Sequence, residues 1–207
     1  MQKLITHLQQ DGFRMKYYDD NAEEYVQKTM PLDMGDLYSK FLRCIPQNGF
    51  ILDAGCGSGR DSLYFLQQGY NVEAFDASRE LSKLAAELTS LPVQCLTFQE
   101  MIPCSRFDGI WANATLLHVP HAELQGVLET LKLALKPGGT LYCSFKYGDT
   151  DSTDQLGRDF TNQTCVSLEK ELAKAGFSGR RTIFTRTSTT PEGGTQEWVI
   201  GIASVPN

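Results

Sequence analysis

The sequence predicts an α/β fold in which helices cover a mostly parallel sheet. Short apolar, strand-like runs alternate with amphipathic helical patterns along the chain, which is typical of parallel strands joined by helical crossovers. Three alternating glycines, Gly55, Gly57 and Gly59, follow the first strand-like run. The chain closes with two β-rich runs around Pro191-Glu192-Gly193-Gly194. Because a short glycine-containing loop joins antiparallel neighbours, we expect one reversed strand at the end of the chain.

Each expected strand is a short apolar or β-branched run bounded by turn-forming residues. Gln47-Asn48-Gly49 sets off the first strand, and Pro92 precedes the third. The expected strands are Phe50–Ala54, Asn71–Asp76, Val93–Phe98, Phe107–Asn113, Thr140–Lys146, Arg181–Thr187 and Glu197–Val205.

The helices are predicted from apolar residues spaced at i, i+3, i+4 and i+7, as in the segment that begins near Ser78. Glycine or Pro-Gly follows three of the four helices, which is a common C-terminal signal. The expected helices run from Gly59 to Gly69, from Ser78 past Leu88, from His121 to Lys136-Pro137-Gly138-Gly139, and through Leu168 to Gly176. Residues 1–46 should form a helical extension with a break near Met30-Pro31, and residues 147–159 a polar loop.

Length and charge limit the classes of function. The 207 residues suit one domain, and the net charge of −6 argues against a general nucleic-acid-binding surface. The apolar runs are shorter than the roughly 20 residues that a membrane helix needs. The first residues, Met1-Gln2-Lys3-Leu4-Ile5, lack the apolar stretch of a signal peptide. We expect a cytoplasmic protein, a monomer or a homodimer, that acts on a small molecule and binds neither nucleic acid nor membrane.

The cysteines and histidines give no metal-site pattern. None of the six cysteines falls in a C-x-x-C pair, and several lie in apolar segments, so we expect buried, reduced thiols. His118 and His121 are three residues apart, but no further ligands accompany them. We therefore predict that no metal is bound.

The segment around the glycines indicates which ligand it binds. Glycines let the backbone turn tightly and approach a ligand, and the helix behind them offers free N–H groups. Asp53 directly before the turn would repel a pyrophosphate and suits an ammonium. An acid at the end of the second strand, Asp76, is placed to bind ribose hydroxyls. These features favour a cationic nucleoside without phosphate.

Five segments, in order, resemble the class I S-adenosylmethionine-dependent methyltransferases. They are Leu52-Asp53-Ala54-Gly55-Cys56-Gly57-Ser58-Gly59, Ala74-Phe75-Asp76-Ala77-Ser78, Phe107-Asp108-Gly109-Ile110, Leu116-Leu117-His118-Val119 and Leu135-Lys136-Pro137-Gly138-Gly139. The segment Gly59-Arg60-Asp61-Ser62 and the tyrosine-rich stretch 17–25 are similar to small bacterial methyltransferases of the tellurite-resistance type.

This resemblance implies a fold and a cofactor. The fold would be a Rossmann-like three-layer sandwich whose seven-stranded sheet has the order 3-2-1-4-5-7-6, with the last strand antiparallel. The cofactor would be S-adenosylmethionine, bound under the N-terminal extension. The implied cofactor-binding residues are Tyr18, Tyr25, Asp53, Ala54, Gly55, Gly57, Arg60, Asp76, Ala77, Ser78, Gln99, Glu100 and Asn113.

Individual roles follow from the same resemblance. Asp53 would hold the amino group of the cofactor and Arg60 its carboxylate, while Asp76 would bind the ribose and Ala77 would pack on adenine. Gln99 and Glu100 are the alternatives for the adenine amino group. Arg60 could instead be a solvated surface cation.

Residues above the strand ends would receive the methyl acceptor. His118 is the candidate general base, since its ordinary pKa of about 6.5 suits neutral pH. Tyr17, Lys146 and Arg158 are candidate acceptor-binding residues, and the two cations suit an anion such as an oxyanion or a thiolate. Two other functions remain open: a cofactor-binding protein without transferase activity, and a nicotinamide-dependent oxidoreductase, which Asp53 and the glycine spacing disfavour.

Overall fold

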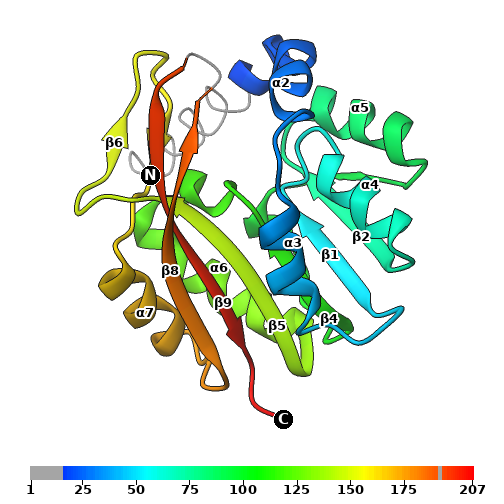
Figure 1. Cartoon of the computed structure of the whole chain (residues 1–207), viewed down its shortest axis with the longest axis vertical. Coiled ribbons are helices and arrows are strands. Elements are labelled where there is room, and N and C mark those ends of the chain that lie inside the picture. Colours follow the sequence, from blue (N-terminus) through cyan, green and yellow to red (C-terminus); the bar gives the residue numbers. More distant parts are fainter. Residues whose placement is uncertain (1–15, 191–192) are drawn as a thin grey trace, which may run out of the picture.

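A computed structural model describes residues 16–190 and 193–207 and contains a seven-stranded sheet (Figure 1). The strand order is β3-β2-β1-β4-β5-β9-β8. These strands are β1 Phe50–Ala54, β2 Asn71–Asp76, β3 Gln94–Cys95, β4 Phe107–Ala112, β5 Leu135–Lys146, β8 Arg181–Thr189 and β9 Thr195–Ser204. The predicted order 3-2-1-4-5-7-6 is confirmed, because the last two runs of the chain are β8 and β9.

The direction of the last strand is also confirmed. β1 pairs in parallel with β2 and β4, and β4 pairs in parallel with β5. β9 runs antiparallel to both of its neighbours, β5 and β8. The hairpin places β9 between β5 and β8, so that its apolar residues are buried in the sheet. Residues Pro191 and Glu192 of the predicted hairpin loop lie outside the described residues.

Helices cover both faces of the sheet and make it a three-layer structure. One face packs on residues of α3 and α4, with Phe41, Phe65 and Trp111 in its core. The other face packs on residues of α6 and α7, with Leu128 and Leu172 in its core. The six helices whose bounds the structure gives in full are α2 Ala22–Thr29, α3 Gly35–Leu42, α4 Arg60–Gln67, α5 Arg79–Thr89, α6 His121–Ala134 and α7 Cys165–Lys174.

The site is positioned by a reversal of strand order beside β1. The chain passes from β1 to β2 and β3 on one side, then crosses to β4 and β5 on the other. Ligands of open α/β sheets bind in the crevice at the carboxyl ends of the strands where the order reverses. Here residues that follow β1 and residues that follow β4 line such a crevice, and α2 lies beyond the carboxyl end of β1 (Figure 1).

Three expected boundaries are wrong. The third strand pairs only over Gln94–Cys95, because Thr97 caps a 3₁₀ turn, Phe98–Glu100, that ends the extended chain. The long helix ends at Ala134 instead of at the Pro-Gly segment, because β5 already starts at Leu135 and pairs with β4 there. The polar loop contains a small antiparallel pair, β6 Ser152–Thr153 with β7 Asp159–Phe160.

The N-terminal extension is described from residue 16 onward. Residues 16–20 are helical, α2 ends at Thr29 and α3 starts at Gly35, so the predicted break near Met30-Pro31 is confirmed. Residues 1–15 of the expected extension lie outside the described residues. Within the described ranges, no helix combines the length and the apolar character that crossing a membrane requires.

The burial expected for the cysteines is only partly right. Cys56 and Cys143 are buried, whereas Cys44, Cys95 and Cys104 are exposed. Cys95 belongs to the short edge strand β3, and Cys104 follows the 3₁₀ turn, so neither position is covered by a helix.

Candidate functional site

The glycine turn after β1 adopts a backbone that other residues rarely take. Gly55, Gly57 and Gly59 have φ angles of 74°, 53° and 77°. A Cβ atom added to Gly55 would lie 1.9 Å from Oγ1 of Thr115, which follows β4. Both the left-handed backbone and this close approach therefore require glycine at position 55.

A cavity with largely apolar walls lies against this turn, and we call it the glycine-turn cavity. Its volume is about 90 Å³. Side chains from the ends of β2, β3 and β4 and from the N-terminal extension surround it. The lining residues are Tyr18, Tyr25, Gly55, Gly57, Phe75, Asp76, Ala77, Leu81, Leu96, Thr97, Phe98, Gln99, Ala114, Thr115, His118 and Val119.

Asp76 ties the turn to the start of α5. One of its carboxylate oxygens accepts from the backbone N–H of Gly57 at 2.8 Å, and the other accepts from that of Ser78 at 2.9 Å. Burial raises the pKa of Asp76, and the two backbone N–H groups partly counter this by favouring the ionised form. Each oxygen keeps a further lone pair for a hydroxyl donor in the cavity.

Two tyrosines of the N-terminal extension close over the cavity. The ring of Tyr25 lies above the turn, since a Cβ atom on Gly57 would be 3.1 Å from its Cε1. The hydroxyl of Tyr18 lies 2.7 Å from Nε2 of His118, on the opposite wall. Burial raises the pKa of Tyr18 to about 12, so its hydroxyl keeps its proton at neutral pH.

Asp19 fastens this extension to α5. Its Oδ1 accepts from the hydroxyl of Ser78 at 2.6 Å and from the backbone N–H of Glu80 at 3.2 Å. A carboxylate at a helix N-terminus is also favoured by the helix dipole. The covering tyrosines are therefore held down by a contact beside the cavity.

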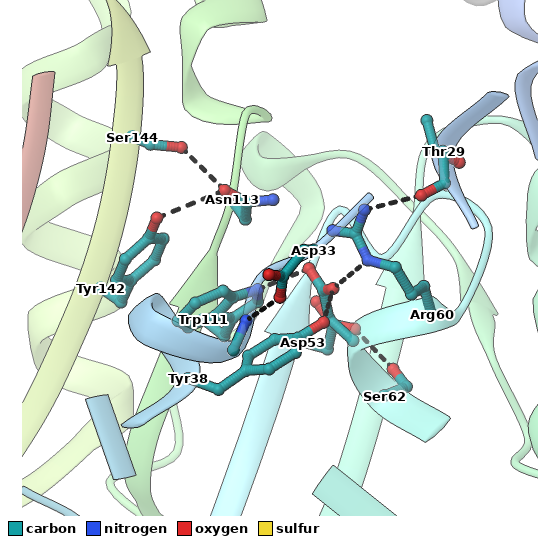
Figure 2. A network of polar contacts seen from close by, with 12 residues as sticks. Thr29, Asp33, Tyr38, Asp53, Arg60, Ser62, Trp111, Asn113, Tyr142 and Ser144 are labelled. Atoms are coloured by element: carbon teal, nitrogen blue, oxygen red, sulfur yellow. Dashed lines mark hydrogen bonds and ion pairs between the residues drawn. The ribbon is translucent and has the colours of Figure 1, made fainter. Parts of the chain in front are cut away.

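Behind the turn lies a buried carboxylate network (Figure 2). Asp61 accepts from the hydroxyl of Tyr38, from Nε of Arg60 at 2.6 Å and from the indole Nε1 of Trp111 at 2.7 Å. Asp53 accepts from the hydroxyl of Ser62 at 2.6 Å. Burial, reinforced by the negative charge of Asp61, raises the pKa of Asp53 to about 8.

Arg60 belongs to this network. Besides its ion pair with Asp61, its Nη1 donates to the backbone carbonyl of Thr29 at 2.9 Å. The buried aspartate raises the pKa of Arg60, against the effect of burial itself. Arg60 thus joins α4 to the end of α2 as a fixed cation, and the alternative of a solvated surface side chain is not what the structure shows.

A second and larger space, the adjoining cavity, begins where the glycine-turn cavity ends. The two share Tyr25 and Ala114, and the adjoining cavity has a volume of about 780 Å³. It is walled by the N-terminal extension, the ends of β4 and β5, the loop after β5, and the hairpin of β8 and β9. Its lining includes Tyr17, Arg60, Asn113, Lys146, Arg158, Arg186 and Trp198.

Asn113 lines the adjoining cavity and is held there by β5 (Figure 2). Its Oδ1 accepts from the hydroxyl of Ser144 at 3.0 Å and from that of Tyr142 at 3.4 Å. With Oδ1 engaged by these donors, the amide N–H₂ of Asn113 is left as a donor for a ligand.

Two cations of this cavity share one aromatic ring. The ammonium of Lys146 lies 3.3 Å from the ring centroid of Phe160, and the guanidinium of Arg158 lies 5.5 Å from it. Arg158 also stacks on Tyr17 at 4.5 Å and forms an ion pair with Asp154 at 2.7 Å. Burial and the charge of Arg158 lower the pKa of Lys146.

Most of the predicted site residues line one of the two cavities. The predicted residues that line the glycine-turn cavity are Tyr18, Tyr25, Gly55, Gly57, Asp76, Ala77, Gln99 and His118. Those that line the adjoining cavity are Tyr17, Tyr25, Arg60, Asn113, Lys146 and Arg158.

Four predicted residues line neither cavity. Asp53 and Ala54 are buried behind the turn, and Ser78 is the buried N-cap of α5. Glu100 is exposed and accepts from the backbone N–H of Thr97, so that it caps the 3₁₀ turn. Of the two alternatives for adenine, Gln99 therefore lines the cavity and Glu100 does not.

Several residues that line the glycine-turn cavity are not among those predicted from the sequence. Leu96, Thr97 and Phe98 were assigned to a strand and form the wall after β3. Thr115 and Val119 flank the Leu116-Leu117-His118 segment, and their position after a strand end was the available signal. In the described residues, no group of three or more His, Cys, Asp and Glu side chains is arranged to hold a metal ion.

The residues present fit a nucleoside bearing an amino acid. Left-handed glycines bring the backbone to the cavity, and an acid faces it where a ribose would lie. Apolar side chains such as Leu96 and Phe98 form the wall that an adenine needs. No phosphate-binding cation lines this cavity among the described residues, which agrees with a ligand that lacks a diphosphate.

Comparisons with known proteins agree with this geometry. A family model described as a methyltransferase domain matches residues 26–180. The chain is 27% identical over 179 residues to the 18S rRNA (guanine-N(7))-methyltransferase bud23 of Schizosaccharomyces pombe, covering 79% of this chain and 62% of that protein. It is 26% identical over 144 residues to the 2-heptyl-1-hydroxyquinolin-4(1H)-one methyltransferase of Mycobacteroides abscessus, covering 65% and 63%. The chain thus spans less than two thirds of these relatives.

The match to one solved structure covers a larger share of both chains than the two sequence matches do. The 1,6-didemethyltoxoflavin-N1-methyltransferase of Burkholderia thailandensis, crystallised with 1,6-didemethyltoxoflavin and S-adenosylhomocysteine, superposes with a TM-score of 0.75 at 22% identity. The match covers 99% of this chain and 90% of that one. At this level of identity the match shows a common fold.

Proposed function

This chain belongs to the methyltransferase-domain family, and we propose that it transfers a methyl group from S-adenosylmethionine to a small-molecule acceptor. One observation carries the proposal: a cavity whose lining groups suit the cofactor adjoins a second cavity large enough for another molecule. The two meet at Tyr25 and Ala114. A protein that only binds the cofactor needs no such second space, which favours transfer over the non-catalytic alternative.

The glycine-turn cavity supplies the contacts that the cofactor needs. The backbone of Gly55 and Gly57 would line its methionine part, and Asp76 would accept from its ribose hydroxyls. Ala77, Leu96 and Phe98 offer apolar contacts for adenine, with Gln99 as the polar side chain at that end.

The charged parts of the cofactor face the network behind the turn. Asp53 would hold the ammonium directly or through a water molecule, and the bound cation would favour the ionised form of this buried carboxyl, which already accepts from Ser62. Arg60 remains the candidate for the carboxylate, although Asp61 and Thr29 already engage Nε and Nη1 of its guanidinium. A nicotinamide dinucleotide is disfavoured because, among the described residues, no Lys or Arg lines the glycine-turn cavity to offset its diphosphate.

The main contribution of the protein to methyl transfer would be to position the acceptor. S-adenosylmethionine supplies a methyl carbon that its sulfonium charge activates. Holding the acceptor in line with that carbon contributes about 7–11 kcal/mol to lowering the barrier. Tyr25 and Ala114 line both cavities and Asn113 lines the adjoining one, so these residues would orient the acceptor and exclude water.

His118 is the proposed general base for acceptors that must lose a proton. Its Nε2 is in contact with the hydroxyl of Tyr18, so the acceptor's proton would move to the oxygen of Tyr18 as the phenol proton moves to Nε2. Such proton transfer contributes about 10²–10⁴-fold to the rate. A thiolate or another soft anion would need no base.

The proposed acceptor is small and carries a negative charge, such as an oxyanion or a thiolate. Lys146 and Arg158 support this, since both line the adjoining cavity and contact Phe160. The relatives named above act on a quinolone, on 1,6-didemethyltoxoflavin and on rRNA. The net charge of −6 favours the small molecules over RNA. Cytoplasmic location, a monomeric or homodimeric state and likeness to the tellurite-resistance type stay predictions of the sequence.

A methylation screen tests the proposal. The protein is incubated with S-adenosylmethionine carrying a deuterated methyl group, together with tellurite, small thiols, aromatic carboxylates, hydroxyquinolines or an 18S rRNA fragment. Mass spectrometry should find a labelled product in a small-molecule class. Labelled RNA with no labelled small molecule would contradict the proposed acceptor class, and consumption of NADH with no methyl transfer would contradict the activity.

A further inference from the structure

We propose that the acceptor is an organic anion with two recognised parts: a negative group held between Lys146 and Arg158, and an apolar body that fills the rest of the adjoining cavity. This inference rests on the proposed methyl transfer and narrows its acceptor. It excludes an inorganic oxyanion as the ligand for which the cavity is built. Three residues would contact the apolar body of the acceptor: Leu32, Leu156 and Trp198. None of them lies in a sequence motif quoted above.

The adjoining cavity is positively charged although the protein is acidic. Five basic side chains line it, and two acidic ones, Glu24 and Asp33, oppose them. The chain as a whole has a net charge of −6. A cluster of cations in one cavity of an acidic protein focuses an attractive field on anions. The five basic residues are Lys28, Arg60, Lys146, Arg158 and Arg186.

Three of these cations already have carboxylate partners. Ion pairs join Lys28 to Glu24 at 2.7 Å, Arg60 to Asp61 at 2.6 Å and Arg158 to Asp154 at 2.7 Å. Lys146 forms no ion pair with any residue in the ranges 16–190 and 193–207.

The position of Lys146 is costly without an anion. Its ammonium is half-buried against Phe160 and lies near a second cation, the guanidinium of Arg158, over the same ring. Burial and then this neighbour lower the pKa of Lys146, and the charge of Asp154 offsets them only in part. A bound carboxylate or phosphate group between the two side chains would reverse this, because it adds an opposite charge at short range.

The rest of the cavity offers apolar contact. Leu32 and Leu156 are large apolar side chains that are 42% and 53% exposed, and both line this cavity. Trp198 lines it too, and its indole Nε1 donates to the hydroxyl of Ser188 at 2.9 Å, which fixes the ring. Exposed apolar side chains gathered in a cavity with a few polar groups are typical of a site for an organic ligand.

The size of the cavity agrees with the same class. Its volume of about 780 Å³ lies within the range of small-molecule sites, about 300–1,000 Å³. An inorganic oxyanion has only a few atoms, so it would contact the cations and leave Leu32, Leu156 and Trp198 in water. An organic anion would reach both ends of the cavity.

A binding experiment on the whole protein tests this acceptor class. Isothermal titration, with saturating S-adenosylhomocysteine and again without it, compares three anions with their neutral alcohols and with inorganic ions. The pairs are benzoate with benzyl alcohol, 2-naphthoate with 2-naphthylmethanol, and octanoate with octanol, and the inorganic ions are phosphate and tellurite. We expect at least one organic anion to bind at least tenfold more tightly than its alcohol and than either inorganic ion.

Two variants assign that preference to the residues. Lys146→Gln should weaken the binding of the preferred organic anion at least tenfold and leave the affinity for the matching alcohol unchanged. Leu156→Asn should weaken the binding of the anion and of the alcohol equally, by about threefold. The controls are Lys170→Gln and Val166→Asn, which make the same kinds of change at exposed positions of α7 that line neither cavity. Both controls should bind like the parent.

The outcomes separate this inference from the proposed function. If S-adenosylhomocysteine binds but phosphate or tellurite binds as tightly as every organic anion, the acceptor class is wrong and the proposed methyl transfer stands. Equal affinity of each anion and its alcohol, or an unchanged affinity in Lys146→Gln, would also overturn the assignment. Failure to bind S-adenosylhomocysteine would contradict the proposed function and, with it, the acceptor role of this cavity.

Discussion

The hydroxyl of Tyr18 lies 2.7 Å from Nε2 of His118, a side chain one hundred positions later in the sequence. The contact joins the N-terminal extension to the 3₁₀ turn Leu116–His118 that follows β4. Both residues line the glycine-turn cavity. The candidate base and the segment that covers the cofactor therefore form one unit.

Tyr18→Phe should slow catalysis more than it weakens cofactor binding. The variant keeps the ring that packs on Tyr25 and removes the hydroxyl that contacts His118. For an acceptor that loses a proton, we expect kcat to fall roughly 10²-fold, the lower end of general acid–base effects. Steady-state kinetics of Tyr18→Phe, of His118→Asn and of the double variant provide the measurement. Because the two groups act together, the double variant should be little slower than either single one, and multiplicative losses would disprove the relay.

Asp76→Ala should weaken the binding of S-adenosylhomocysteine by roughly 1–3 kcal/mol, the scale of a lost charge-assisted hydrogen bond. Asp76 also accepts from Gly57 and Ser78, so thermal unfolding must show that the variant is folded. Isothermal titration gives the affinity. Glu87→Ala, at an exposed position of α5, is the control and should bind normally. An unchanged affinity in Asp76→Ala would remove this residue from the site.

The buried Asp53 predicts that the free energy of unfolding depends on pH. Its pKa is raised to about 8, mainly by burial and then by Asp61, whereas the unfolded chain has an aspartate pKa of about 3.9. Between these values the unfolded chain releases the proton and the folded protein keeps it. Stability from this group is therefore present below about pH 4 and is lost as the pH rises towards 8.

Asp53→Asn removes that contribution and can still accept from Ser62. Relative to the parent, the variant should gain stability as the pH rises from 5 to 8. Urea unfolding at both pH values measures the difference in free energy of unfolding. A difference that stays constant with pH would show that Asp53 does not titrate in this range.

Asp19→Ala should speed the release of the cofactor. The carboxylate accepts from Ser78 and Glu80 and so holds the segment that carries Tyr18. We expect the dissociation rate of S-adenosylhomocysteine to rise roughly tenfold, since a hydrogen bond to a charged group contributes about 1.5–3 kcal/mol. Stopped-flow displacement measures this rate. Asp20→Ala is the matched control, because Asp20 is exposed and pairs with Lys16. Equal dissociation rates of S-adenosylhomocysteine in the two variants would show that Asp19 does not hold the covering segment in place.

The strands and helices were predictable because each of their signals was local. The glycine turn, the alternation of strands and helices, and the terminal hairpin each depend on neighbouring residues, and the resemblance supplied their arrangement. The ends of elements were less predictable, since they depend on competition between nearby groups. Thr97 and Glu100 cap a 3₁₀ turn and so end β3 early, although the residues around them look like a strand.

The candidate site was predicted best where a residue follows directly from a strand. Asp76 and Asn113 line the cavities as expected at strand ends. The contact of Thr115 with Gly55 and the pairing of Arg60 with Asp61 could not be predicted, because they depend on how distant or adjacent side chains turn in three dimensions. The same holds for the shared contact of Lys146 and Arg158 with Phe160.

Titration of the protein with S-adenosylhomocysteine and with NADH tests the central claim most directly. Both ligands contain an adenosine, and only NADH carries a diphosphate, for which the described lining of the glycine-turn cavity offers no Lys or Arg. We predict saturable binding of S-adenosylhomocysteine at one site per chain and no measurable heat with NADH. Tight binding of NADH together with no binding of S-adenosylhomocysteine would contradict the assignment of this cavity to a methyl donor.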